Sequence, residues 1–262
     1  MERFEALRGY YEHYDEDARL TSRHGSVEFL TTVSYIEKYL RPGMRILEIG
    51  AGSGRYSHYF ARKGYAVDAV ELMECNISVF RDRKEEGENV SIIQGDAVDL
   101  RGVSSGQYDI TLLLGPMYHL FAESERLSAI SEALRVTKPD GIVFAAYCLN
   151  EATVIQFGFQ KGMIRQEPYR HLIDPVTFRC AAEPSEVFAL WRREDIDALM
   201  AHFSVERLHY VGTDMATNYM RACVDEMDDE MFALYLRYHF SICERADCVG
   251  TSHHVLDIFR KA

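Results

Sequence analysis

The stretch that decides the fold is Ile46-Leu47-Glu48-Ile49-Gly50-Ala51-Gly52-Ser53-Gly54-Arg55. Its first four residues form the largely apolar run of a buried strand, and glycines then occupy alternate positions before a helical pattern begins. Glycine carries no Cβ, and a helix N-terminus presents unpaired N–H groups. A strand that ends in this way therefore brings bare backbone close to a ligand.

The glycine spacing excludes two common ligands for such a loop. The dinucleotide fingerprint requires glycine at its first, third and sixth positions, and the sixth position here is Arg55. The phosphate-binding P-loop ends in Gly-Lys-Ser or Gly-Lys-Thr, and the sequence contains neither triplet. The loop is therefore predicted to bind neither a dinucleotide nor a nucleoside triphosphate.

Composition indicates a globular protein in a reducing compartment. The chain has 262 residues, of which 47% are hydrophobic and 27% charged, enough for one large α/β domain or two small ones. Its longest apolar runs are far shorter than the roughly 20 residues of a membrane span, and the N-terminus lacks the apolar segment of a signal peptide. The six cysteines are scattered without a Cys-x-x-Cys pair, so we expect free thiols and a cytoplasmic location.

The net charge of −12 weighs against a nucleic-acid substrate, since proteins that grip a phosphate backbone usually carry a basic surface. No nucleic-acid partner and no membrane partner is predicted. The sequence leaves open whether the protein is a monomer or a homodimer.

Strand and helix patterns alternate along most of the chain. The apolar runs predict strands at 45–49, 66–72, 90–93, 108–114, 142–148, 205–211 and 254–259. Residues 139–141 (Pro-Asp-Gly) are predicted to turn the chain into the fifth strand. The alternation favours βαβ units and a parallel sheet. The rhythm breaks at residues 150–190, which we interpret as a helical or irregular insertion after the fifth strand within a single domain of residues 1–262.

The first four predicted strands all end in glycine or an acid, namely Gly50, Glu71, Asp96 and Gly115. The carboxyl ends of parallel strands meet at one edge of the sheet, where open α/β sheets bind their ligands. Glu71 follows the glycine loop by about 20 residues, and a carboxylate there suits a ribose diol because it accepts two hydroxyl hydrogen bonds. Asp96 is placed to accept a hydrogen bond from an exocyclic amine.

Together these motifs make residues 46–148 resemble the class I S-adenosylmethionine-dependent methyltransferases, most closely the small-molecule branch called methyltransferase type 11. The resemblance implies a Rossmann-like, doubly wound α/β fold with a mostly parallel seven-stranded sheet, its last strand antiparallel, and a helical lid or insertion. It also implies S-adenosylmethionine as cofactor and methyl transfer by in-line displacement, giving S-adenosylhomocysteine. The cofactor-binding positions would be Glu48, Gly50, Ala51, Gly52, Gly54, Glu71, Leu72, Met73, Asp96, Ala97 and Leu114.

The segment Gly115-Pro116-Met117-Tyr118-His119 leaves the fourth strand where the reaction would occur. A sulfonium is already an activated methyl donor, so a base is needed only if the nucleophile arrives protonated. The hypothesis is that His119 is a general base or substrate orienter and that Tyr118 shapes the methyl passage. The structural alternative is that His119 only caps the junction between loop and helix.

Substrate contacts are expected from Met117 and from an N-terminal lid over residues 1–25 that includes Tyr11 and Tyr14. A structural helix packed by its tyrosines on the sheet edge is the alternative. His253 and His254 are adjacent, but no third ligand stands at metal-site spacing, so no metal is predicted.

The sequence therefore favours an enzyme that methylates a small molecule. The alternatives are an RNA or protein methyltransferase and a non-catalytic module that binds S-adenosylmethionine. The methyl acceptor itself is not identified by any motif.

Overall fold

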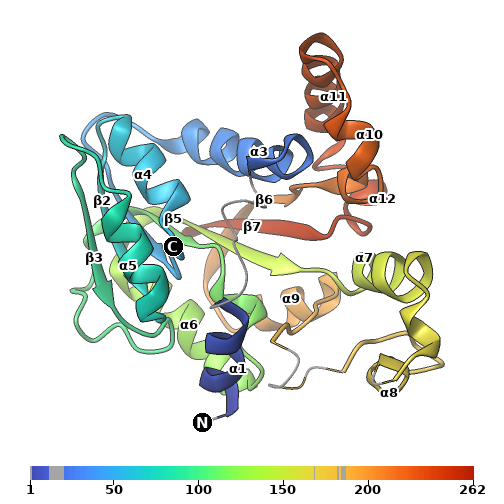
Figure 1. The fold of residues 1–262 in the computed structure, drawn as a ribbon. Helices are drawn as coiled ribbons and strands as arrows, with labels where there is room; N and C mark the ends of the chain where they lie inside the picture. The colour runs from blue at the N-terminus through green and yellow to red at the C-terminus, as the bar shows by residue number, and fades with distance from the viewer. Residues whose placement is uncertain (1, 12–20, 168, 182, 184–186) are drawn as a thin grey trace.

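The computed structural model describes residues 2–11, 21–167, 169–181, 183 and 187–262 (Figure 1). A seven-stranded sheet runs through it in the order β3-β2-β1-β4-β5-β7-β6. Strand β7 is antiparallel to both of its neighbours, and the other pairs are parallel. The predicted fold class is therefore confirmed. The strands are β1 (Arg45–Ile49), β2 (Ala66–Glu71), β3 (Val90–Gln94), β4 (Tyr108–Leu113), β5 (Thr137–Cys148), β6 (Val205–Gly212) and β7 (His254–Lys261).

Helices cover both faces of the sheet, because its central strands are apolar on both sides. Helices α3 (Arg23–Tyr39), α4 (Arg55–Arg62) and α5 (Glu74–Asp82) bury Ile36, Phe60 and Phe80 in one core cluster. Helices α6 (Glu123–Val136) and α9 (Arg193–Met200) bury Ile130 and Ile196 in the cluster on the other face. The ligand edge of the sheet lies between these two layers.

The fifth strand starts earlier than predicted. Residues 139–141 do not form a turn ahead of β5; they lie inside it, where Asp140 has φ 59°. Tyr108 of β4 pairs with Thr137, whereas Ile110 pairs with Ile142, so β5 holds extra residues between the two pairs. This bulge depends on pairing with β4 and leaves no local sequence signal.

The segments outside the alternating units surround the carboxyl edge of the sheet. Helix α1 (Glu2–Tyr11) buries Leu7, and the 3₁₀ turn η1 (Pro116–Tyr118) follows β4. The insertion begins directly after β5 with α7 (Asn150–Thr153), η2 (Val154–Gln160), η3 (Met163–Arg165) and α8 (Tyr169–Leu172) (Figure 1). The elements between β6 and β7 are η5 (Met215–Tyr219), α10 (Arg221–Asp225), α11 (Asp229–Ile242) and α12 (Ala246–Val249). Tyr14, expected in the N-terminal lid, lies outside the described residues.

Candidate active site

A pocket opens at the carboxyl ends of β1, β2, β3 and β4, with about 590 Å³ of empty space including its open mouth. We call it the glycine pocket. Most of its wall comes from the motifs that the sequence singled out, and Leu7 and Tyr11 of α1 complete it. It is lined by Leu7, Tyr11, Gly50, Gly52, Glu71, Leu72, Met73, Asn76, Gly95, Asp96, Ala97, Gly115, Pro116, His119 and Leu120.

The three glycines of the loop are required for different structural reasons. Gly50 has φ 74°, and a Cβ there would lie 2.7 Å from the Pro116 ring, so the loop after β4 packs directly on bare backbone. Gly52 has φ 54°, and a Cβ there would meet nothing within 4 Å, which leaves open space on the pocket side. Gly54 does not line the pocket. It begins α4 with φ 84°, and a Cβ there would lie 2.4 Å from the Phe80 ring.

Glu71 is held rigidly at the end of β2. Its carboxylate accepts hydrogen bonds from the Gly52 amide at 2.8 Å, the Met73 amide at 2.9 Å and the Asn76 side chain at 3.2 Å. The side chain is only 5% exposed, yet it lines the pocket. Two carboxylate oxygens offer about four acceptor sites, so these contacts leave capacity for a ligand hydroxyl.

Glu48 lies beneath the glycine loop rather than in the pocket wall. It is 2% exposed and accepts hydrogen bonds from the backbone N–H and the hydroxyl of Ser57. Burial raises the pKa of Glu48 to about 8, because the Ser57 hydrogen bonds only partly offset desolvation and the charge of Glu71 adds to it. Glu48 therefore ties β1 to α4 and acts on the pocket through the backbone it supports.

Some of the other predicted cofactor-binding residues line the glycine pocket, and the rest lie behind its wall. Leu72, Met73, Asp96 and Ala97 line the pocket. Asp96 also accepts a hydrogen bond from the Val98 amide at 3.2 Å, which fixes the loop after β3. Ala51 is buried behind the loop, and Leu114 contributes its carbonyl to a hydrogen bond from the Tyr118 hydroxyl at 2.9 Å.

His119 joins the pocket to the N-terminal helix. Its Nδ1 lies 2.8 Å from the carbonyl oxygen of Val187, and its Nε2 lies 2.8 Å from the Tyr11 hydroxyl. A carbonyl can only accept, so Nδ1 carries a proton, and in the neutral ring Nε2 accepts from Tyr11. This tautomer places the lone pair that a base requires on Nε2, beside Tyr11, while the Val187 carbonyl orients the ring.

A second, larger cavity adjoins the first, with about 1790 Å³ of empty space including its open mouth. We call it the insertion cavity, because much of its wall comes from residues 153–190. Tyr11 lines both spaces. The insertion cavity is lined by Tyr10, Tyr11, Tyr118, Cys148, Thr153, Phe157, Gly158, Met163, Tyr169, Leu172, Ile173, Cys180, Ala181, Phe188, Leu190, Arg221, His253 and His254.

Met117 is not placed as expected. Its side chain is fully buried in the core cluster that contains α6 and α9, and its carbonyl accepts a hydrogen bond from the Trp191 indole at 3.1 Å. The 3₁₀ turn over 116–118 directs consecutive side chains in different directions, so Tyr118 reaches the insertion cavity while Met117 points into the core.

Sequence reasoning missed several residues that form the walls. Asn76 and Leu120 line the glycine pocket, and Phe188 lines the insertion cavity. Asn76 lies in the first turn of α5, and from there its side chain reaches back to Glu71 at the end of β2. No local signal marks Phe188, which lies beyond strand and helix patterns.

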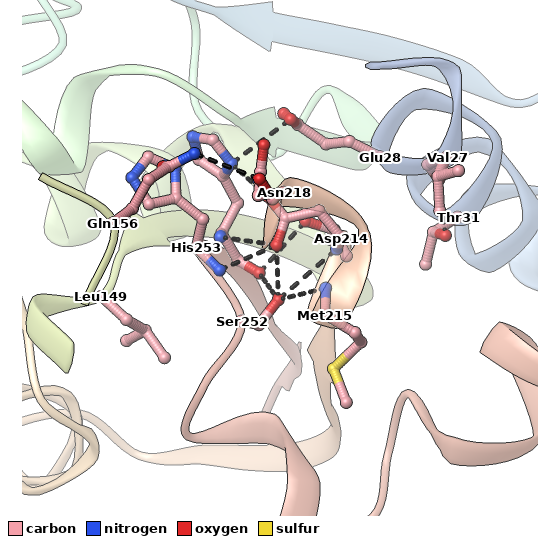
Figure 2. Close-up of polar contacts among 12 residues, drawn as sticks. Val27, Glu28, Thr31, Leu149, Gln156, Asp214, Met215, Asn218, Ser252 and His253 are labelled. Carbon is pink, nitrogen blue, oxygen red and sulfur yellow. Dashed lines mark hydrogen bonds and ion pairs between the residues drawn. The ribbon is translucent and has the colours of Figure 1, made fainter. Parts of the chain in front are cut away.

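The structure also brings together three potential metal ligands. Donor atoms of Asp214, His253 and His254 lie within 4.8 Å of one another, although Asp214 is some 40 residues from the histidines in sequence. Figure 2 shows that Asp214 is already enclosed by donors, among them Ser252 and Asn218. The sequence predicted no metal because the spacing shows no third ligand. The third ligand comes from the turn after β6.

Residues 46–141 match the family model described as a methyltransferase domain. The chain is 28% identical over 196 residues to a ubiquinone biosynthesis O-methyltransferase of Azotobacter vinelandii, a match that covers 72% of this chain and 82% of that protein. It is 32% identical over 126 residues to a probable ribosomal RNA small subunit methyltransferase A of Methanosarcina mazei, covering 43% of this chain and 46% of that protein.

Solved structures share the fold at low sequence identity. The PH0226 protein of Pyrococcus horikoshii superposes with a TM-score of 0.64 at 16% identity, covering 97% of this chain and 99% of that one. Phosphoethanolamine N-methyltransferase 1 of Haemonchus contortus, solved with phosphoethanolamine and S-adenosylhomocysteine, gives a TM-score of 0.61 at 15% identity, covering 99% of this chain and 48% of that one. Within the described residues, no helix combines the length and apolarity that a membrane crossing demands.

Proposed function

We propose that this chain, which carries a class I S-adenosylmethionine-dependent methyltransferase domain, methylates a small molecule bound in the insertion cavity. The match of residues 46–141 to a methyltransferase domain and the methyltransferases among the curated relatives support the family, the enzyme class and the cofactor expected from the sequence. The choice of a small acceptor over RNA is our proposal, since relatives of both kinds exist.

The residues of the glycine pocket fit the cofactor. Gly52 leaves open the space that a Cβ would fill, and the Glu71 carboxylate is held beside it with remaining acceptor capacity. Glu71 would hold the ribose hydroxyls, Asp96 the adenine amine, and the backbone of Gly50 and Gly52 the methionine part. When bound, S-adenosylmethionine supplies an activated methyl group on its sulfonium sulfur.

The observation that carries the proposal is the shared wall between the two spaces. Tyr11 lines both, and His119, hydrogen-bonded to Tyr11, stands at the boundary. Among the described residues, Tyr11 therefore forms part of the partition between an acceptor in the insertion cavity and the glycine pocket. The largely apolar and aromatic lining would limit the access of water to the reacting atoms, and a concave cavity of this kind suits a small molecule better than a polymer.

The roles of the chain's own residues follow from this geometry. His119, with Nδ1 fixed on the Val187 carbonyl, presents Nε2 as the acceptor for a proton released by the methylated oxygen or nitrogen. Tyr11 holds that nitrogen in the absence of substrate and releases it when an acceptor hydroxyl takes its place. Tyr118 donates to the Leu114 carbonyl, which keeps its ring along the passage.

The direct test has two parts. Thermal unfolding with S-adenosylhomocysteine should show stabilisation, and NAD should not; stabilisation by NAD alone would refute the cofactor assignment. Methyl transfer from labelled S-adenosylmethionine should then be measured on a metabolite extract and on total RNA. Label in RNA but not in small molecules would favour the RNA alternative, and binding without any turnover would favour a non-catalytic module.

Replacing His119 by Gln tests the base. We expect kcat to fall by about 10²- to 10⁴-fold, the usual contribution of a positioned base, with little change in S-adenosylhomocysteine affinity. Tyr118→Phe, which lies on the same turn, serves as the comparison. Turnover of His119→Gln within a few-fold of the unmodified protein would reduce His119 to a structural cap.

A further inference from the structure

The insertion cavity has an uneven distribution of charge. Its described lining residues include Arg221, His253 and His254 but no aspartate or glutamate. The rest of that lining is apolar, aromatic or weakly polar. In a chain with a net charge of −12, a cavity without a lining carboxylate and with three nitrogen-bearing side chains is a local exception.

The three nitrogen-bearing side chains form one connected group. The rings of His253 and His254 meet edge to face with centroids 4.7 Å apart. Asn218 connects Arg221 to the histidines: its side-chain oxygen accepts from Arg221 at 2.7 Å, and its amide donates to Asp214 at 2.6 Å. Asp214 in turn lies 2.8 Å from His254 Nδ1. We call Arg221, His253 and His254 the basic wall.

The carboxylates of this network lie behind the basic wall and not in the cavity. Asp214 is 2% exposed, and both of its oxygens are taken by donors, including the backbone amides of His253 and His254 at 2.8 and 3.2 Å. Glu28 of α3 reaches the same His254 nitrogen at 3.3 Å (Figure 2). With Asp214 saturated in this way, a metal ion would have to displace existing hydrogen bonds, and we assign none.

These contacts keep the His254 ring protonated. Burial alone would lower its pKa, but the charge of Glu28 and the hydrogen bond to Asp214 outweigh burial and hold the pKa well above its usual range. Nδ1 serves the carboxylates and the ring also hydrogen-bonds the Cys148 side chain, so His254 contributes chiefly its positive charge to the cavity that it lines. Arg221 donates through Nε and Nη2 to the Asn218 oxygen, which holds the guanidinium at the cavity edge.

His253 supplies an independent observation that points to a ligand. Burial, together with the charge of His254, lowers the pKa of His253 to about 4, so its ring is neutral and offers a hydrogen bond and not a charge. Its Nδ1 is buried and has no hydrogen-bond partner among the residues that the structure describes. Its Nε2 makes only a long contact of 3.5 Å with the Thr153 hydroxyl. A buried polar atom without a partner is unfavourable, so a ligand that supplies the missing hydrogen bond gains affinity.

We propose that the basic wall is an oxyanion subsite, where Arg221, His253 and His254 bind a carboxylate or phosphate group of the methyl acceptor. This inference rests on the proposed function and narrows it: the acceptor has an apolar or aromatic body and one oxyanion. The body lies against Phe157, Phe188 and Tyr118, and the group to be methylated points toward His119.

The test measures binding to the protein saturated with S-adenosylhomocysteine, by isothermal titration with matched pairs of probes. One arm compares 3,4-dihydroxybenzoate with 3,4-dihydroxybenzamide, and the other compares phenyl phosphate with phenol. We expect the anionic member of at least one pair to bind at least tenfold more tightly than its neutral partner. The arm that shows the preference identifies carboxylate or phosphate as the recognised group.

Arg221→Gln should reduce that preference by about tenfold without changing affinity for the neutral probe or for S-adenosylhomocysteine. Arg237→Gln, an exposed arginine on α11 outside the cavity lining, is the matched control and should keep the preference. His253→Asn gives a second measure at a position whose ring nitrogen lacks a partner.

Equal binding of charged and neutral probes, no binding of either oxyanion, or equal effects of Arg221→Gln and Arg237→Gln would overturn the subsite. Failure of the proposed function looks different, since S-adenosylhomocysteine would then not bind or no small molecule would be methylated. Methylation of neutral acceptors with no preference for oxyanions would remove the subsite and leave the proposed function standing.

Discussion

The buried carboxyl of Glu48 makes the stability of this protein depend on pH in a direction opposite to that of most acids. Its pKa is raised from 4.5 to about 8 in the folded state. Between these values the folded protein holds a proton that the unfolded chain has released, so stability falls as pH rises. Each pKa unit corresponds to about 1.4 kcal/mol, which gives a total loss of up to about 5 kcal/mol above pH 8.

Glu48→Gln replaces the protonated carboxyl with a neutral group of the same shape, whose oxygen still accepts from Ser57. Urea unfolding followed by circular dichroism at pH 5 and pH 8.5 should show the variant gaining on the unmodified protein by about 4 kcal/mol between the two conditions. Glu74→Gln, at an exposed position on α5, should show no such gain. Parallel pH curves for Glu48→Gln and the unmodified protein would refute the reasoning.

Two further predictions concern the glycine loop and the pocket that it borders. Gly54→Ala should destabilise the fold by about 2–5 kcal/mol in the same unfolding assay, because its Cβ would lie 2.4 Å from the Phe80 ring at a left-handed φ. Gly106→Ala, with φ 64° and no neighbour within 4 Å, isolates the backbone cost and should lose about 1–2 kcal/mol; equal losses would show that packing on Phe80 is unimportant. Glu71→Gln should weaken S-adenosylhomocysteine binding about tenfold by isothermal titration, the effect of about 1.4 kcal/mol, whereas an unchanged Kd would remove Glu71 from the site.

The first and last residues of strands β1 to β4 could be predicted because they depend on the local sequence pattern. Apolar runs bounded by glycine and acids located β1 to β4 to within about one residue, and the shared edge of a parallel sheet then implied that Glu71 and Asp96 meet. The start of β5 was wrong because the bulge opposite Tyr108 exists only through pairing with β4.

The direction in which a side chain points was the second feature that the sequence could not predict. The sequence shows that Gly54 is a glycine but not which neighbour requires it to be one, and that neighbour is the ring of Phe80 and not the pocket. Met117 sits in a segment that reaches the site, yet its own side chain turns into the core. The basic wall needs Asp214 and His254, which adjacent strands bring together and which no spacing rule connects.

The two spaces draw on different parts of the chain, and this has a consequence for how the protein could change. Apart from Leu7 and Tyr11, the glycine pocket comes from residues 50–120, whereas most of the insertion cavity comes from residues 148–254. If the insertion cavity holds the methyl acceptor, as we propose, substitutions in the later segment would alter which molecule is accepted and leave the earlier segment intact. Tyr11 is the exception, because it is the one residue in both described linings. A substitution at Tyr11 would therefore change the walls of both the glycine pocket and the insertion cavity.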